Sequence, residues 1–396
     1  MKKLVLAYSG GLDTSYCLKK LSNEGFDVHA ISINTGGFDE KEILIQKEKA
    51  MEMGAKKFKS IDATDKFYNK IIKFLIFGNI LKNNTYPLSV SSERIIQAVE
   101  IVNYAKKINA NYIAHGSTGA GNDQVRFDMI FQVIAPDIKI ITPIRDNKVS
   151  REDEIKFLKS SGINLSWEKA KYSINKGLWG TSVGGNETLT SDKPLPDKAY
   201  PNKLINKTSE KIVLTFSKGE LIKLNGKKNS PVNIIKSIQK IAEKFAIGRD
   251  THVGDTIIGI KGRVGFEAAA PMIIIKAHHL LEKHTLSKWQ QFQKEQLSNF
   301  YGMLLHEGQY LDEVMRNIES FLENSQSKVN GEVYINLLPF RFELDGIKSP
   351  NDLMNDDFGS YGEINKSWSA DEAKGFIKIS SISNKIYYQT NIKDKK

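Results

Sequence analysis

The chain has 396 residues, which predicts two domains with room for an appendage rather than one core. Its 40% hydrophobic and 26% charged content fits a globular protein, and no segment approaches the ~20 apolar residues of a membrane span. The net charge of +11 comes mainly from lysines scattered along the chain, without a dense basic and aromatic stretch. We therefore predict no nucleic-acid partner and no membrane partner.

The lone cysteine, Cys17, excludes an internal disulfide. A signal peptide is not predicted either, because the apolar run after Met1-Lys2-Lys3 ends by Ser9 and Asp13 follows. Both observations favour a cytoplasmic protein. Cys17 itself is expected to be a small buried residue, with a reactive thiol as the alternative.

The first predicted strand, Leu4–Ala7, runs into a glycine loop and then a helix-like stretch. The adjacent glycines let backbone N–H groups approach an anion, and hydroxyls and the helix N-terminus add further donors. Asp13 suits Mg²⁺ or a water of its shell better than it suits a phosphate. The alternative is an ordinary turn, but the context predicts a phosphate site, and Walker A and dinucleotide patterns are absent. The segment reads Ala7, Tyr8, Ser9, Gly10, Gly11, Leu12, Asp13, Thr14, Ser15.

Strand-like and helix-like segments alternate through the first 160 residues, as in a parallel sheet with crossover helices. Helices are predicted at Lys41–Met53, ended by Gly54, and at Ser92–Ile108. A capping pattern at Ser150–Asp153 opens another, which ends near Gly162. The further predicted strands are Val28–Asn34, Lys57–Asp62, Tyr112–His115 and Lys139–Thr142.

The composition changes after Gly162. The segment from Lys169 to Pro201 is rich in Gly, Ser, Thr, Asn and Pro and is expected to be a long ordered loop. A long helical stretch is predicted over Met272–Leu322, with breaks near His284 and Gly302, and the tail over Ser369–Lys385 is predicted to be an amphipathic arm that binds another copy. Between and beyond these lie a predicted hairpin (Ile212–Phe216 and Leu221–Leu224), a helix (Pro231–Phe245), and strands at Thr256–Ile260, Val264–Phe266 and Val333–Leu344.

A second polar loop follows the strand at Tyr112–His115. Asn122, Asp123 and Arg126 offer an amide, a carboxylate and a fork-shaped cation within five residues. This set suits an amino acid, because the carboxylate can hold an ammonium group and the arginine a carboxylate. The alternative is a solvated helix N-terminus capped by Asn or Asp. In a parallel sheet both loops would face one crevice at the carboxyl ends of the strands.

The first loop resembles the pyrophosphate loop of the N-type ATP pyrophosphatases, which split ATP between its α and β phosphates. Together with Gly121–Phe127, it resembles the argininosuccinate synthase family over nearly the whole chain. Further matching segments are Tyr86–Leu88, Tyr172–Ile174 leading to Ser182, Gly259–Arg263, and Lys374–Ile379 at the start of the family's oligomerising tail. The resemblance implies ATP-dependent ligation of L-citrulline and L-aspartate through citrullyl-AMP, with Mg²⁺, in a homotetramer.

Residue roles follow from the resemblance. ATP would be bound by Ala7 to Ser15, with Ile33 and Gly116. Aspartate would be bound by Thr118, Asn122 and Asp123, and citrulline by Tyr86, Ser91, Asn122, Arg126, Ser173 and Ser182. Asp13, Asp123 and Arg126 are the candidate catalytic residues, with Asp13 also the candidate Mg²⁺ ligand.

The resemblance also implies the architecture. It predicts an α/β fold with a Rossmann-like parallel-sheet nucleotide-binding domain over residues 1–163. An α+β synthetase and multimerisation domain would follow over 164–360, and a helical oligomerisation tail over 361–396.

Two departures concern the citrulline pocket. The family commonly has glutamate where Gly254 stands and tyrosine where Phe266 stands, both near citrulline. Glu267 or Asp255 could compensate, or the substrate could differ. The family's Thr-Ser-Leu-Ala-Arg run also appears here as Val90–Arg94. A tRNA-modifying ATP pyrophosphatase and a non-catalytic nucleotide-binding protein are the alternative functions, although the first usually needs cysteines and the second would be expected to lose Asp13 or Arg126.

Overall fold

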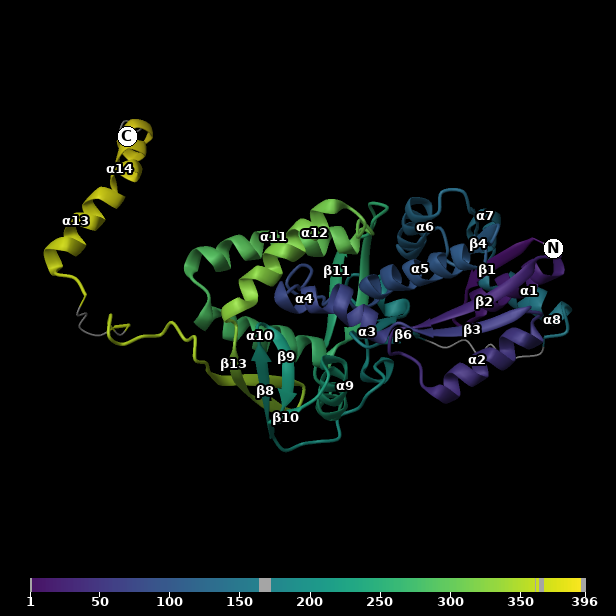
Figure 1. The fold of residues 1–396 in the computed structure, drawn as a ribbon, viewed down its shortest axis with the longest axis horizontal. Helices are drawn as coiled ribbons and strands as arrows, with labels where there is room; N and C mark the ends of the chain where they lie inside the picture. Colours follow the sequence, from purple (N-terminus) through teal and green to yellow (C-terminus); the bar gives the residue numbers. More distant parts are fainter. Residues whose placement is uncertain (1, 164–171, 360, 363–366, 393–396) are drawn as a thin grey trace. The chain divides into compact units, whose positions relative to one another are not determined.

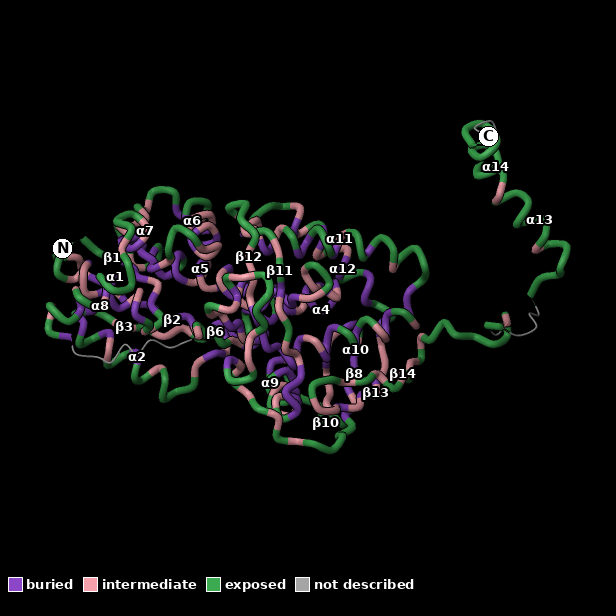
Figure 2. The backbone as a smooth tube through the Cα atoms, turned by 180° about the vertical axis from the view of Figure 1, so that it is seen from behind, coloured by how far each residue is buried: buried purple, intermediate pink, exposed green. Residues whose placement is uncertain are grey.

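The structure is a computed structural model that describes residues 2–163, 172–359, 361–362 and 367–392. It contains two compact units, a large one ending at Asn351 and a small one starting at Asp352. Figure 1 shows the order of the elements, and Figure 2 shows that the buried stretches lie in the large unit. Among the described helices, none has the length and apolar character needed to cross a bilayer.

The N-terminal part is a parallel five-stranded sheet in the order β3-β2-β1-β4-β5, as the alternating pattern predicted. Leu4 and Leu6 face one buried layer, and Val5 between them faces the other, so both faces of the sheet are covered. The strands are β1 (Lys3–Ala7), β2 (Asp27–Asn34), β3 (Lys57–Asp62), β4 (Tyr112–Ala114) and β5 (Lys139–Ile141). All five predicted strands of this region are thereby confirmed.

Local signals define the helices around this sheet. Asp39 caps α2 in a capping box with Glu42, and Gly54 follows the helix with φ +97°, as a C′ glycine should. Ser150 accepts from the Asp153 N–H and starts α8 as predicted. The helices are α1 (Leu12–Asn23), α2 (Glu40–Glu52), α5 (Ser89–Lys107), α6 (Asp123–Ile134), α7 (Pro143–Asn147) and α8 (Arg151–Ser160).

A further helical segment was not predicted. It consists of α3 (Thr64–Phe67), a π-helical turn η1 (Tyr68–Ile72) and α4 (Lys73–Phe77). Its apolar residues include the consecutive buried run Phe74 to Phe77. The sequence therefore lacks the one-sided apolar stripe by which an amphipathic helix is predicted.

The rest of the large unit contains two antiparallel sheets. One has the order β10-β9-β8-β13-β14 and packs against α9 and α10; the other has the order β11-β12-β7-β6. The first contains β8 (Glu210–Ser217), β9 (Glu220–Leu224), β10 (Lys227–Lys228), β13 (Gly331–Leu338) and β14 (Arg341–Lys348), and confirms the predicted hairpin. The second contains β6 (Ser173–Gly177), β7 (Gly180–Gly184), β11 (Arg249–Asp255) and β12 (Lys261–Glu267).

The second sheet corrects two predictions. The described part of the expected loop from Lys169 to Pro201 contains the β6–β7 hairpin and the 3₁₀ turns η2 (Asn186–Leu189) and η3 (Asp197–Ala199). Its first strand is mostly exposed, so no burial pattern marks it. The predicted strand Thr256–Ile260 is instead the turn between β11 and β12, where Gly259 has φ +86° and Thr256 N–H donates to the Ile260 carbonyl.

Helical segments complete the large unit: α9 (Pro231–Ala242), η4 (Glu243–Phe245), α10 (Ala269–Thr285), α11 (Lys288–His306), α12 (Glu313–Ser325) and η5 (Gln326–Lys328). The predicted break near His284 is confirmed, but the one at Gly302 is wrong. Gly302 lies within α11, where a Cβ would meet Ile80 Cγ2 at 2.7 Å, so this glycine serves close packing. The helix ends at His306, and Gly308 just beyond it has φ +84°.

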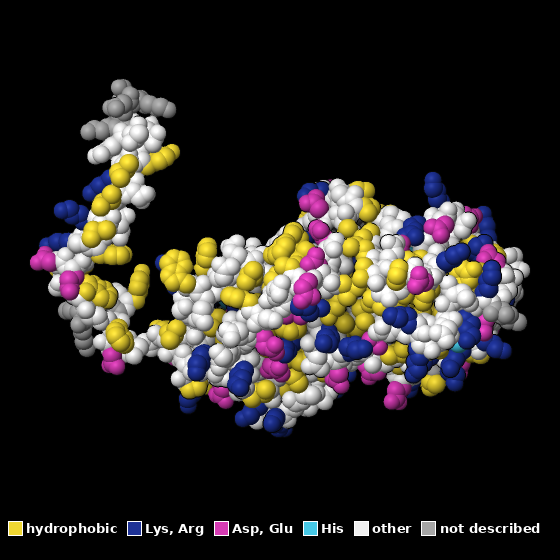
Figure 3. Space-filling view, turned by 45° about the horizontal axis from the view of Figure 1, so that its top comes forward, with side chains coloured by type: hydrophobic (Ala, Val, Ile, Leu, Met, Phe, Trp, Pro, Cys, Tyr) yellow, Lys and Arg dark blue, Asp and Glu magenta, His cyan; other side chains and the backbone are white. Residues whose placement is uncertain are grey.

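The small unit carries the predicted helical arm, as α13 (Ala370–Ser380) and α14 (Ile382–Asn391). Ser369 begins α13 with a capping box. None of the residues in these two helices is buried, and hydrophobic side chains lie along them in Figure 3.

Candidate functional site

A cavity of about 1150 Å³ lies at the carboxyl ends of β1, β2 and β4 and extends to β6, β7, β11 and β12. Single small-molecule sites are roughly 300–1,000 Å³, so this one has room for more than one ligand. Two predicted residues, Gly10 and Ser15, do not line it. The predicted residues that do are Ala7, Tyr8, Ser9, Gly11, Leu12, Asp13, Thr14, Ile33, Tyr86, Ser91, Gly116, Thr118, Asn122, Asp123, Arg126, Ser173 and Ser182.

The glycine loop is held by its own hydroxyls. Ser9 Oγ and Thr14 Oγ1 lie 3.2 Å apart, and Thr14 Oγ1 donates to the Gly11 carbonyl at 3.3 Å. Gly10 has φ +78°, and a Cβ there would come within 3.0 Å of the Gln46 side chain on α2. The loop therefore needs glycine at this position, while Ser15 is buried beneath it.

Asp13 lies in the first turn of α1 and reaches the cavity. Glu154 on α8 is its neighbour, and burial together with the charge of Asp13 raises the pKa of Glu154 to about 8. Of these two carboxyl groups, Asp13 is the one that lines the cavity. A Cβ on Gly116 would lie 3.2 Å from the Asp13 carbonyl carbon, so the two polar loops lie against each other.

Asp123 lies between two arginines. Its carboxylate accepts from Arg94 Nε at 2.9 Å and from Arg126 Nη1 at 3.1 Å. Burial raises the pKa of Asp123, but Arg94 and Arg126 outweigh burial and hold it below its usual value. Arg126 also donates through Nε and Nη2 to the His306 carbonyl, at 2.9 and 2.8 Å. The cluster is therefore an ionised carboxylate held between two guanidinium groups, and all three residues line the cavity.

The second loop is tied to the antiparallel sheet. Asn122 Oδ1 accepts from the Ile257 N–H at 2.9 Å, in the turn between β11 and β12. Gln124 donates to the Gly119 carbonyl at 2.5 Å. The first contact joins the second loop to the β11–β12 turn, and the second is internal to the loop.

The far wall of the cavity contains Tyr86, Ser182, His252 and Gly254. Tyr86 is buried, its hydroxyl accepts from the Val90 N–H at 3.1 Å, and its ring stacks on His252 with centroids 5.3 Å apart. Of the two residues that could compensate for the family's glutamate at position 254, Asp255 lines the cavity and Glu267 does not. Glu267 is buried, pairs with Arg249 at 3.0 Å and Asn202, and does not line the cavity.

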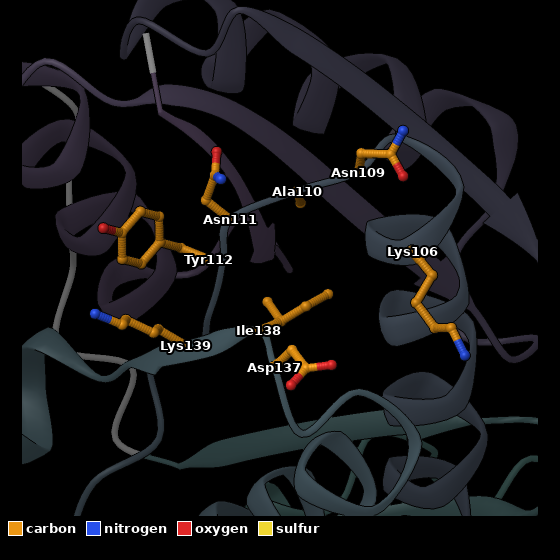
Figure 4. A pocket seen from close by; sticks show the side chains of 8 residues that line it. All are labelled: Lys106, Asn109, Ala110, Asn111, Tyr112, Asp137, Ile138 and Lys139. Atoms are coloured by element: carbon orange, nitrogen blue, oxygen red, sulfur yellow. The ribbon is translucent and has the colours of Figure 1, made fainter.

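Several cavity residues were missed from the sequence. Glu93 and Arg94 were noticed only as a departure from a family pattern, and His252 and His306 carried no recognisable signal. Burial raises the pKa of Glu93 to about 8, with Arg94 opposing the rise. A separate hollow of about 520 Å³ lies at the opposite end of β4 and β5 (Figure 4) and contains none of the predicted site residues.

Comparison with known proteins gives matches over both halves of the chain. Residues 3–164 match the family described as arginosuccinate synthase N-terminal HUP domain, and residues 172–387 match the arginosuccinate synthase C-terminal domain. The chain belongs to the argininosuccinate synthase family. Family members are ligases, and the full-length match disfavours a tRNA-modifying or non-catalytic protein.

Curated relatives of this synthase family match over nearly their whole length. Argininosuccinate synthase from Dictyoglomus turgidum is 36% identical, over 98% of this chain and 97% of its own. The protein of the same name from Methanocaldococcus jannaschii is 35% identical over 97% of both chains. That from Xanthomonas axonopodis pv. citri is 33% identical over 98% of this chain and 95% of its own.

Proposed function

We propose that this member of the family joins L-citrulline to L-aspartate, with ATP cleaved to AMP and pyrophosphate. The observation that carries the proposal is a single cavity lined by both the glycine loop after β1 and the Arg94–Asp123–Arg126 cluster. The first supplies anion donors for a triphosphate, and the second supplies paired charges for amino-acid substrates.

In the proposed reaction the citrulline ureido oxygen attacks the α-phosphate of ATP, and pyrophosphate leaves. The aspartate amine then displaces AMP from citrullyl-AMP. The loop from Ala7 to Ser15, with Ile33 and Gly116, would bind ATP. Thr118, Asn122 and Asp123 would bind aspartate, and Tyr86, Ser91, Asn122, Arg126, Ser173 and Ser182 would bind citrulline. Catalysis would come from positioning and from charge stabilisation, because neither step needs a nucleophilic side chain.

Asp13 fits a role in holding Mg²⁺. Magnesium commonly takes one or two protein carboxylates together with substrate phosphates, and Asp13 is a cavity carboxylate beside the glycine loop. When bound, the ion would neutralise phosphate charge. Asp13 would fix it next to the loop, and Asp123 and Arg126 would orient the amino acids.

We also propose the division into domains at residues 163/164 and 360/361, a cytoplasmic location, and a homotetramer. The support for the tetramer is the arm, where no residue of α13 or α14 is buried although Phe376, Ile377 and Ile379 are apolar. A second copy would cover these side chains.

The test is pyrophosphate release from Mg-ATP, with L-citrulline and L-aspartate each supplied at saturation or withheld. We expect release to require L-citrulline. Argininosuccinate should appear by mass spectrometry only when aspartate is also present. ATP binding without any release under all these conditions would contradict the proposed function.

A further inference from the structure

The inference rests on the proposed function and concerns the side-chain carboxylate of L-aspartate, which distinguishes this substrate from other amino acids. The residues proposed to bind aspartate are Thr118, Asn122 and Asp123. They supply a hydroxyl, an amide and a carboxylate, but no cation. A carboxylate that leaves water needs a charged partner or several hydrogen-bond donors. Another residue of the cavity must therefore supply the positive charge.

Three of the cationic side chains that line the cavity have other partners. Arg263 donates to the carbonyls of the segment that follows β7, namely those of Glu187, Thr190 and Lys193. Arg151 begins α8 and interacts with Glu154, the neighbour of Asp13 at the glycine loop. Arg126 keeps only 4% of its side chain exposed and is proposed to bind citrulline. The cavity then offers Arg94 and Lys176 to the second carboxylate of aspartate.

Arg94 is the better placed of these two cations. Its Nε donates to Asp123 at 2.9 Å, whereas no hydrogen bond or ion pair joins Lys176 to Asp123 in the described part of the chain. The side chains of Arg94 and Asp123 remain 15% and 35% exposed. Only two carbon atoms separate the ammonium group of aspartate from its side-chain carboxylate. A ligand whose ammonium group lies at Asp123 therefore has its side-chain carboxylate close to Arg94.

The guanidinium of Arg94 is held in place and still has donors to offer. Its Nη1 donates to Gln97 Oε1 at 3.2 Å, and its Nη2 donates to Asn175 Oδ1 at 3.3 Å. Together with the bond to Asp123, these contacts use three of the five N–H groups of an arginine. The remaining two, one on each terminal nitrogen, have no partner among the described residues. Two N–H groups of one guanidinium can bind a carboxylate through both of its oxygens.

The charge around Arg94 also suits an anionic ligand. Gln97 and Asn175 are neutral, so they orient the guanidinium without cancelling its charge. Glu93 Oε2 lies 4.0 Å from Arg94 Nη1, and burial raises the pKa of Glu93 to about 8, so this carboxyl is mostly protonated near neutral pH. The Arg94–Asp123–Arg126 cluster then carries one net positive charge, which matches the one net negative charge of L-aspartate.

We infer that Arg94 binds the side-chain carboxylate of L-aspartate and determines the preference of the enzyme for this amino acid over its uncharged amide, L-asparagine. Asp123 holds the ammonium group beside it. The steps of the reaction are those of the proposed function, since the amine of aspartate still displaces AMP from citrullyl-AMP.

The experiment compares L-aspartate with L-asparagine in the unmodified enzyme and in Arg94→Gln, with saturating Mg-ATP and L-citrulline. The condensation products are quantified by mass spectrometry. We expect kcat/KM for aspartate to fall about a hundredfold in the variant, which corresponds to ~2.7 kcal/mol. The value for asparagine should change by less than about threefold, because asparagine has no charge to lose. If asparagine is not condensed, its inhibition constant against aspartate takes the place of kcat/KM.

Three further variants separate the charge of Arg94 from its effect on Asp123. Arg94→Lys keeps a cation, so aspartate should remain the preferred amino acid even where both rates fall. Lys176→Gln removes the other cation and should leave the preference within about threefold of that of the unmodified enzyme. Gln97→Glu places a carboxylate beside Arg94 Nη1 and should lower the preference about tenfold by neutralising the guanidinium in place.

The outcomes separate this inference from the proposed function. Equal falls for aspartate and asparagine in a folded Arg94→Gln enzyme would show that Arg94 only positions Asp123, and would overturn the inference. A preference lost in Lys176→Gln would assign the carboxylate to Lys176 and overturn it too. If Arg94→Gln does not fold, an unchanged preference in Gln97→Glu has the same consequence. Absence of citrulline-dependent pyrophosphate release from the unmodified enzyme would instead contradict the proposed function.

Discussion

Replacing Arg126 with lysine keeps the charge but removes the fork. Arg126 makes two hydrogen bonds to the His306 carbonyl and one to Asp123. One lysine nitrogen cannot keep both partners in this buried position, so at least two of the three bonds are lost. At about 1.5–3 kcal/mol for each bond with a charged group, the loss is about 3–6 kcal/mol. Part of this lost free energy reduces substrate binding, because Asp123 and the ureido substrate are no longer held in place.

A hundredfold fall in kcat/KM corresponds to ~2.7 kcal/mol, which is less than the free energy of the lost bonds. We therefore expect kcat/KM for citrulline to fall about a hundredfold or more. The assay is pyrophosphate release, with ATP binding measured separately and expected to change little. Arg145→Lys is the matched control. Arg145 pairs with Asp128 at 2.6 Å but does not line the cavity, and its partly exposed ion pair should contribute about 0–1 kcal/mol. An Arg126→Lys enzyme that is folded and retains kcat/KM within about threefold of the unmodified enzyme would refute the reasoning.

Three further predictions concern the loop, a buried carboxyl and the arm. Gly10→Ala should raise the ATP KM about tenfold, because φ is +78° and the new Cβ approaches Gln46. The control is Gly25→Ala, where φ is +83° and nothing lies within 4 Å, and it should leave the ATP KM unchanged. Equal ATP KM values in the two variants would contradict this prediction. Glu93 has a pKa of about 8 in the native state and near 4.5 in the unfolded state, so the native state binds its proton more tightly. The free energy of unfolding should therefore fall as pH rises between these two values, by on the order of 1 kcal/mol per pH unit. Glu93→Gln should flatten this decline in urea titrations from pH 5 to 8, and parallel curves would show that the carboxyl is not the cause. Removing all residues after Asn351 should lower the particle mass measured by light scattering below that of a tetramer, while the large unit keeps its melting temperature. An unchanged number of subunits would exclude the arm as the oligomerising element.

The sequence by itself determined the parallel sheet and its two polar loops. Strands such as Leu4–Ala7 are short apolar runs bounded by glycine or polar residues, and helices such as α2 begin and end at local caps. Because parallel strands place their carboxyl ends at one edge, the loops at Ser9 and Asn122 could be assigned to one crevice before any contact was known. The motifs in these loops also carried the family resemblance.

Only the tertiary structure decided the far wall of the cavity. The strand β6 is almost wholly exposed and forms through pairing with β7 rather than through a hydrophobic pattern of its own. Arg126 and His306 are 180 residues apart in the chain, and His252 on β11 stacks on Tyr86, which lies just before α5. Local propensity acts over a few residues, whereas these contacts depend on how distant segments pack. For that reason the sequence could show a glycine at position 254, but only the folded chain could show that a Cβ there would come within 2.7 Å of His252 Nε2.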